Sequence, residues 1–215
     1  MERFFREPIN GLTHLFGAFL SIIALILMVI KAIKLNGFGL ASLSVCLFGL
    51  SLILLYSASA TYHLVKAKDN AIAFLRRLDH SMIFILIGGS YMPYLLIGLE
   101  GKSRVFLTTL IIILTILGVL FKMIWFNCPR WLSTLLYIGM GWISIFAIPY
   151  FENIPAEAML WLLIGGILYT LGGIIYATKP KFLNYSYFGF HEIFHIFILL
   201  GSLSHFISVF FFLLK

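Results

Sequence analysis

The sequence predicts an all-α membrane protein in which seven transmembrane helices form one bundle, with a cytoplasmic N-terminus and the C-terminus outside. Its 215 residues are 62% apolar and 11% charged, with a mean hydropathy of +1.07, whereas soluble domains average about 25% charged residues. Apolar runs long enough to cross a bilayer recur along the whole chain. The polar breaks are too short for a soluble domain, so residues 1–215 are expected to form a single transmembrane domain.

Each helix is expected where an apolar run reaches about 20 residues, which cross about 30 Å of hydrocarbon at 1.5 Å per residue. The first run follows two arginines, as in a signal peptide, but it continues past 20 residues without a clear cleavage motif, so we expect a retained helix. The expected spans are 10–32, 40–63, 77–98, 104–125, 131–149, 157–177 and 190–212. The breaks between them are Lys31 to Gly39, Lys66 to Arg77, Glu100 to Arg104, Asn127 to Arg130, Tyr150 to Glu157 and Lys179 to Tyr187.

The basic residues predict the orientation of the bundle. Seven spans place the two termini on opposite sides, and ten of the 15 Lys and Arg residues then fall on the side of the N-terminus. Because cytoplasmic loops are enriched in Lys and Arg, the N-terminus is expected inside. The same residues are dispersed among short loops despite a net charge of +7, which suits a membrane surface and argues against a nucleic-acid partner.

A small set of ionisable residues predicts a metal site, because such groups are costly at membrane depth. His63 ends the second span, Asp79 lies at the start of the third, and His191 and His195 open the seventh, so the topology brings all four to one depth. His191 and His195 share a helix face at the spacing i, i+4, which suits two imidazoles on one Zn²⁺. His63 supplies a third nitrogen, and Asp79 could ligate the metal or hold its water. Three protein ligands and an open position are typical of catalytic zinc.

The other histidines have simpler interpretations. We expect His14 and His205 to be packed, hydrogen-bonded residues within their helices. His80 follows Asp79 but points about 100° away on a helix, so we expect it to be exposed at the membrane interface.

Four segments of the sequence resemble the hemolysin III family, and together the match runs over nearly the whole chain. They are Glu-Pro-Ile-Asn-Gly-Leu-Thr-His (7–14), Ser-Ala-Ser-Ala-Thr-Tyr-His (57–63), Leu-Asp-His-Ser-Met-Ile-Phe (78–84) and Gly-Phe-His-Glu-Ile-Phe-His (189–195). The wider superfamily includes progestin and adiponectin receptors and alkaline ceramidases. Its pattern of Ser-x3-His, an Asp and His-x3-His is matched here by Ser59 with His63, by Asp79, and by His191 with His195.

The resemblance implies a seven-helix fold with zinc near the cytoplasmic leaflet of a bacterial inner membrane. It implies that His63, His191 and His195 bind the zinc, that Asp79 orients or deprotonates the zinc-bound water, and that Ser59 supports the site or an oxyanion. The implied reaction is the hydrolysis of an amide or ester bond in a membrane lipid, with a role in membrane lipid homeostasis.

Three other functions stay open at this point. The same ligands could hold a structural zinc in a sensor or receptor. His191 to His195 also match H-E-x-x-H, which would make Glu192 the general base of an intramembrane metalloprotease. The family name suggests a cytolysin or channel, although ionisable residues gathered on one leaflet do not resemble a polar path through the membrane.

Overall fold

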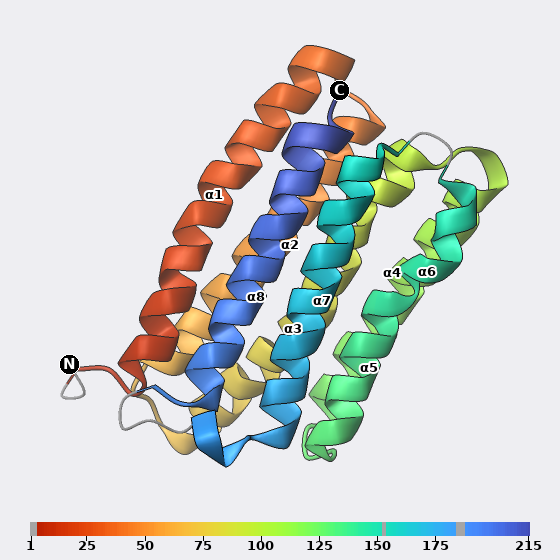
Figure 1. Cartoon of the computed structure of the whole chain (residues 1–215). Coiled ribbons are helices and arrows are strands. Elements are labelled where there is room, and N and C mark those ends of the chain that lie inside the picture. Colours follow the sequence, from red (N-terminus) through yellow and green to blue (C-terminus); the bar gives the residue numbers. More distant parts are fainter. Residues whose placement is uncertain (1–3, 152–153, 184–187) are drawn as a thin grey trace.

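The protein is a bundle of long helices packed side by side (Figure 1); the computed structural model describes residues 4–151, 154–183 and 188–215. Seven segments are long and apolar enough to cross a membrane, which confirms the predicted fold class and number of spans. The helices are α1 (Pro8–Asn36), α2 (Leu40–Leu64), α3 (Asp69–Gly98), α4 (Gly101–Ile124), α5 (Arg130–Trp142), α6 (Ser144–Ala147), α7 (Ala156–Thr178) and α8 (Phe190–Ile207). Single 3₁₀ turns cover Ile148–Tyr150 and Lys181–Leu183, and a π-helical segment, Ser208–Leu213, extends α8.

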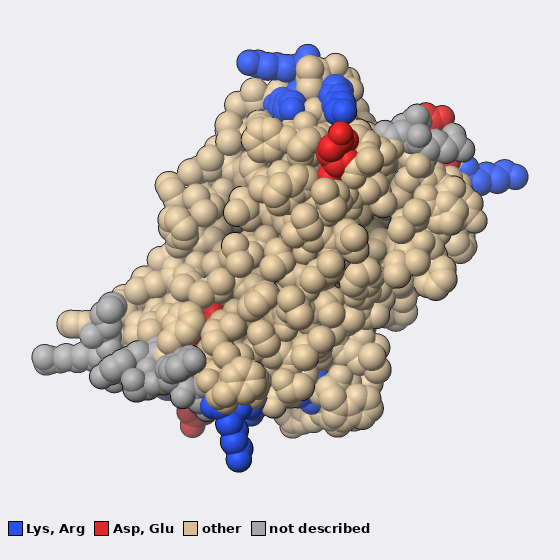
Figure 2. Space-filling model, viewed as in Figure 1, with Lys and Arg blue, Asp and Glu red and all other residues tan. Residues whose placement is uncertain are grey.

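The surface of the bundle fits a lipid environment. Lys and Arg side chains gather at its two ends and leave a broad belt between them (Figure 2). Large apolar side chains such as Phe19, Ile113 and Phe146 are exposed along the helices, so the chain is a multi-pass membrane protein. The beginning of α1 and the end of α8 lie at opposite ends (Figure 1); which end faces the cytoplasm stays a prediction.

Several helices are longer than their apolar runs. α3 begins at Asp69, eight residues before the predicted start at 77, because hydropathy misses helical turns that are rich in polar residues. Its 30 residues span about 45 Å, against about 30 Å of hydrocarbon, so its first turns extend beyond the apolar slab. α1 likewise extends past both ends of the predicted 10–32. The breaks predicted at Tyr150–Glu157 and Lys179–Tyr187 lie partly outside the described residues.

The predicted fifth span over 131–149 is confirmed as the membrane-length segment Arg130–Tyr150, but its helix is interrupted. α5 ends at Trp142, α6 starts at Ser144, and a 3₁₀ turn follows. Two glycines in α5, and Pro149 in the 3₁₀ turn, weaken helix formation over this stretch.

The hydroxyl of Tyr91 on α3 replaces backbone hydrogen bonds at this break. It accepts a bond of 2.8 Å from the Ser144 N–H, and it can donate to the carbonyl of Met140 at 2.8 Å or of Gly141 at 2.6 Å. An unpaired backbone group in hydrocarbon costs several kcal/mol, so the break depends on this side chain.

α8 lies beside α1, so the first and last helices are neighbours. It packs against α7 and against α1, and Tyr56 of α2 forms a hydrogen bond with Ser202 of α8. Gly165 of α7 allows the close approach of α8, since a β-carbon there would lie 2.2 Å from the His205 ring. The helices that carry the N-terminal and C-terminal parts of the chain therefore pack together, with α2 in contact with α8 as well.

Replacing Tyr91 by Phe removes only the hydroxyl that spans the break. We expect Tyr91→Phe to lower the free energy of unfolding by about 1–3 kcal/mol, because buried backbone groups lose their partner. Thermal unfolding in detergent micelles would measure this. Tyr150→Phe is the matched control, since that side chain is 55% exposed, and equal stability of the two variants would contradict the role of Tyr91.

Candidate metal centre

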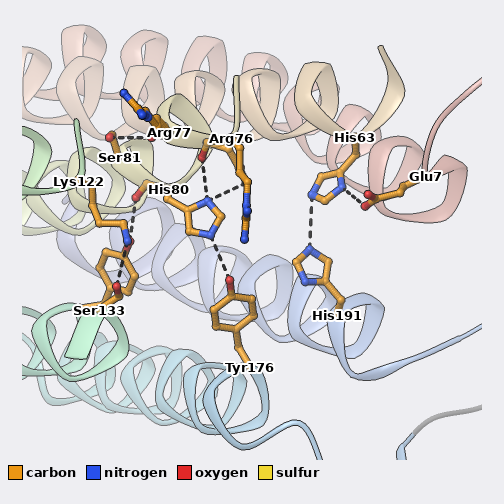
Figure 3. A network of polar contacts seen from close by, with 12 residues as sticks. Glu7, His63, Arg76, Arg77, His80, Ser81, Lys122, Ser133, Tyr176 and His191 are labelled. Atoms are coloured by element: carbon orange, nitrogen blue, oxygen red, sulfur yellow. Dashed lines mark hydrogen bonds and ion pairs between the residues drawn. The ribbon is translucent and has the colours of Figure 1, made fainter. Parts of the chain in front are cut away.

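Three histidine side chains from two helices meet at the N-terminal end of the bundle. His63 lies in the last turn of α2, and His191 and His195 lie in the first two turns of α8. One ligand nitrogen from each ring lies within 4.8 Å of the other two. The Nε2 atoms of His63 and His191 are 3.4 Å apart, and the two rings face each other across the gap between the helices (Figure 3).

A hydrogen bond from His63 to Glu7 fixes which nitrogen of His63 is free. His63 is only 1% exposed, and its Nδ1–H donates to Oε2 of Glu7 at 2.6 Å. This bond lowers the pKa of Glu7, which precedes α1, to about 2. In the neutral ring, Nε2 then keeps its lone pair on the side of His191, as metal ligation requires.

The separation of two of the three nitrogens suits a tetrahedral zinc ion. Zn–N bonds of about 2.0–2.1 Å separate two nitrogen ligands by about 3.3–3.4 Å, and the His63–His191 separation is 3.4 Å. The His195 nitrogen lies within 4.8 Å of both. The donor set is imidazole only, which suits zinc, and it leaves a fourth position for water or substrate.

One face of α1 contacts the histidine-bearing helices. Glu7, Asn10 and His14 follow each other at spacings of three and four residues, which places them on one side of a helix. Asn10 Nδ2 donates to Oε1 of Glu192 at 2.9 Å, and the His14 ring stacks on the His195 ring at 3.6 Å and 8°. In the sequence, this segment is marked only by its family resemblance. A further signal for its role is three polar residues at helical spacing at the start of an apolar run.

The remaining histidines differ in part from expectation. His14 and His205 are packed as predicted, but neither ring makes a well-formed hydrogen bond among the described residues. The expectation that His80 is exposed is wrong, because its side chain is only 13% exposed. Its Nδ1–H donates to the Arg76 carbonyl at 2.9 Å, and its Nε2 accepts from the Tyr176 hydroxyl at 3.0 Å. α7 therefore covers a residue that the sequence alone places at the surface.

Glu192 has a structural role at the start of α8. Its Oε2 accepts a bond of 2.8 Å from the Gly189 N–H, which caps the helix, and its Oε1 accepts the bond from Asn10. Both carboxylate oxygens are thus bonded to groups outside the histidine cluster. This arrangement differs from that of a general base facing the metal, as the H-E-x-x-H interpretation requires.

Asp79 and Ser59 lie on the wall of the cavity that reaches the histidines. Asp79 does not join the group of ligand atoms within 4.8 Å, and its nearest ionic neighbour is the His80 Nδ1, 3.6 Å away. Ser59 Oγ is buried beside the Asp79 carboxylate, at a geometry too poor for a full hydrogen bond. Both groups are therefore placed to act on a molecule in the cavity.

The cavity is apolar and runs along the inside of the bundle. Its volume is about 360 Å³, within the range of small-molecule sites. His191 and His195 line one end, and Phe151 and Met159 line the other, nearer the C-terminal end of the bundle. Residues of the broken fifth span, such as Trp142 and Ile145, form part of its wall. An apolar space that extends from the histidines toward the other end of the bundle can receive an acyl chain.

Comparisons with known proteins find similarity along nearly the whole chain. The family model described as "Haemolysin-III related" matches residues 2–206. "Hemolysin-3" of Bacillus cereus is 39% identical over 216 residues, which cover 100% of this chain and 95% of the relative. "Hemolysin-3 homolog" of Bacillus subtilis (strain 168) is 35% identical over 213 residues, which cover 97% of this chain and 95% of the relative. The similarity includes the helices that carry all three histidines.

Metal analysis of purified protein tests the ligand set. His63→Ala, His191→Ala and His195→Ala are each expected to reduce bound zinc from one ion per chain to near zero, because two imidazoles hold zinc far more weakly than three. His205→Ala, which lines the same cavity, is the control and should retain zinc. Full zinc content in the three variants would exclude this site.

Glu7 is expected to support zinc binding through His63. Loss of an outer-shell partner lowers metal affinity by about 10–100-fold, so Glu7→Ala should show a loss of this size in a competition titration with a chelator. Glu7→Gln, which keeps an acceptor but not the charge, should lie between the wild type and Glu7→Ala. Glu100→Gln, at the N-cap of α4, is the control, and unchanged affinity in both Glu7 variants would contradict this role.

Proposed function

The chain belongs to the hemolysin III family, and we propose that it is a zinc-dependent membrane hydrolase that cleaves an amide or ester bond of a lipid. We place it in a bacterial inner membrane with a cytoplasmic N-terminus, where it acts on membrane lipid composition. One observation carries the proposal: three histidine nitrogens close enough to share one ion lie at the end of an apolar cavity.

The three histidines would hold the metal ion that activates the water and the carbonyl group. His63, His191 and His195 would hold Zn²⁺ and leave one position open. Zinc in such a site lowers the pKa of a bound water to about 7 and polarises a carbonyl oxygen. Glu7 keeps the His63 ring in the tautomer that this binding needs.

The cavity wall supplies the remaining groups. Asp79 accepts the proton of the attacking water, since it is the carboxylate that lines the cavity beside the histidines. Ser59 donates its unpaired hydroxyl to the carbonyl oxygen as negative charge develops there. The apolar side chains hold the acyl chain and keep bulk water from the reacting bond.

The alternatives predict different measurements. A sensor with structural zinc would bind a lipid without turnover, whereas the unpaired Ser59 hydroxyl and the nearby Asp79 favour chemistry on the ligand. The relatives carry the name hemolysin, which suggests cytolysis. Leakage of a dye from liposomes that contain the purified protein would support that function, and intact liposomes with lipid turnover would support hydrolysis.

Two acidic residues separate the hydrolase from the metalloprotease. Asp79→Asn should lower kcat for lipid hydrolysis by about 10²–10⁴-fold while zinc is retained, because a general base is lost. Glu192→Gln should keep activity within about tenfold, because it disturbs only the cap of α8 and the hydrogen bond from Asn10. Lipid release by mass spectrometry and metal content measure both effects. A dead Glu192→Gln beside an active Asp79→Asn would overturn the assignment.

A further inference from the structure

Three cationic side chains gather around two aromatic rings at the N-terminal end of the bundle. The guanidinium carbon of Arg76 lies 5.0 Å from the Phe126 ring centre, and Nζ of Lys122 lies 5.2 Å from the same ring. The guanidinium carbon of Arg130 lies 5.2 Å from the Tyr176 ring centre. We call Arg76, Lys122 and Arg130 the cationic cluster.

The cationic cluster borders the histidine site. The Tyr176 ring lines the cavity and lies 5.7 Å from the His191 ring. The charges of Arg76 and Arg130 both act on His191. Figure 3 shows the Arg76 side chain extending toward the region between Tyr176 and His191, whereas Arg77 turns away from the histidines.

No carboxylate neutralises this cluster within the described part of the chain. The ion pairs found there join Glu7 to Arg6 and His63, and Asp79 to His80. Like charges held together in a partly dry environment repel one another unless an anion lies between them. A bound zinc ion would add further positive charge, so the site as a whole favours an anionic ligand.

The two arginines and the lysine of the cationic cluster differ in how many of their hydrogen-bond donors are already used. Nζ of Lys122 donates to Ser133 Oγ at 2.9 Å and to Cys128 Sγ at 3.5 Å. Nη1 of Arg130 is buried and makes no hydrogen bond among the described residues. A guanidinium matches two oxygens of a phosphate at once, which makes Arg76 and Arg130 the members of the cluster suited to this ligand.

The depth of the cluster agrees with a lipid phosphate. α3 is longer than the hydrocarbon layer is thick, and Arg76 lies two turns from its start. This position corresponds to the headgroup layer. Basic pockets between transmembrane helices bind phosphates of lipid headgroups.

We propose that Arg76 and Arg130 bind the phosphate of a phospholipid at the mouth of the cavity and so select a phosphate-bearing glycerolipid ester as the substrate. The proposal rests on the proposed hydrolase function and narrows its substrate class. The lipid places its phosphate on the two arginines, one ester carbonyl at the histidines and the acyl chain of that ester in the cavity. Water adds its oxygen to the carbonyl carbon, the bond to the glycerol oxygen breaks, and that oxygen takes up a proton. The products are a fatty acid and a lysophospholipid.

Lipid binding to the metal-free protein tests this site without turnover. Purified full-length protein, stripped of metal by a chelator in an uncharged detergent, is titrated with dioleoyl phosphatidic acid and with dioleoylglycerol, which has the same chains and no phosphate. Native mass spectrometry measures the bound fraction. Arg76→Gln/Arg130→Gln is compared with Arg77→Gln/Lys181→Gln, which removes the same charge from the same end of the bundle.

We expect the wild type to bind the phosphatidic acid at least tenfold more tightly than the diacylglycerol, as charged hydrogen bonds of about 1.5–3 kcal/mol imply. The affinity of Arg76→Gln/Arg130→Gln for phosphatidic acid should fall about tenfold, while its affinity for the diacylglycerol is unchanged. The affinity of the control double variant for phosphatidic acid should fall by less than about twofold. An equal loss of affinity in the two double variants would mean that only the total positive charge of this surface matters, and it would overturn the proposal. Displacement of the lipid by millimolar inorganic phosphate would assign the site to the free ion instead.

Two further measurements test the proposal if the double variant does not fold, and separate it from the hydrolase function. If the double variant does not fold, Arg76→Gln and Arg130→Gln are tested singly, and each is expected to lose at least about threefold for the phosphatidic acid. Retained affinity in both would overturn the proposal. If the zinc-loaded protein binds phosphatidic acid but does not hydrolyse it, the hydrolase function is overturned and the phosphate site stands. If it hydrolyses phosphate-bearing and phosphate-free esters at equal rates, only the proposed substrate class is overturned.

Discussion

The hydrogen bond between His63 and Glu7 is the contact on which the site depends. It joins the end of α2 to the start of α1, where the Glu7 N–H also donates to the His63 carbonyl at 2.9 Å. A charged acceptor beside a nearly buried imidazole fixes the position of the ring as well as its proton. The other contacts of α1 follow from this junction, because Asn10 and His14 then face Glu192 and His195.

The bilayer explains why most buried hydroxyls of the bundle have a hydrogen-bond partner within the protein, since lipid offers none. Tyr94, for example, donates its hydroxyl to Ser208. The irregular fifth span obeys the same rule through Tyr91. The wall of the apolar cavity departs from this pattern, because the hydroxyls of Ser59 and Thr134 there have no hydrogen-bond partner among the described residues.

The sequence predicts the fold well because hydropathy measures directly what the bilayer selects. It locates the seven spans, and topology alone brings together His63, His191 and His195, which lie up to 132 positions apart in the sequence. It misses features that depend on tertiary contacts. The break after Trp142 needs Tyr91 of another helix, and the burial of His80 needs α7. The roles of Glu7 and Glu192 are not predicted either. A glutamate in a short motif looks the same in the sequence whether its side chain faces the histidines or caps a helix.

The contact between Asn10 and Glu192 links residues 182 positions apart, from the first and last helices of the chain. During synthesis, α1 leaves the ribosome long before α8 exists, so Glu7 and His63 enter the membrane before His191 and His195. The three histidines can meet only when α8 inserts beside α1 and α2. A zinc ion bound as proposed would therefore add its binding energy only to a bundle that contains α8.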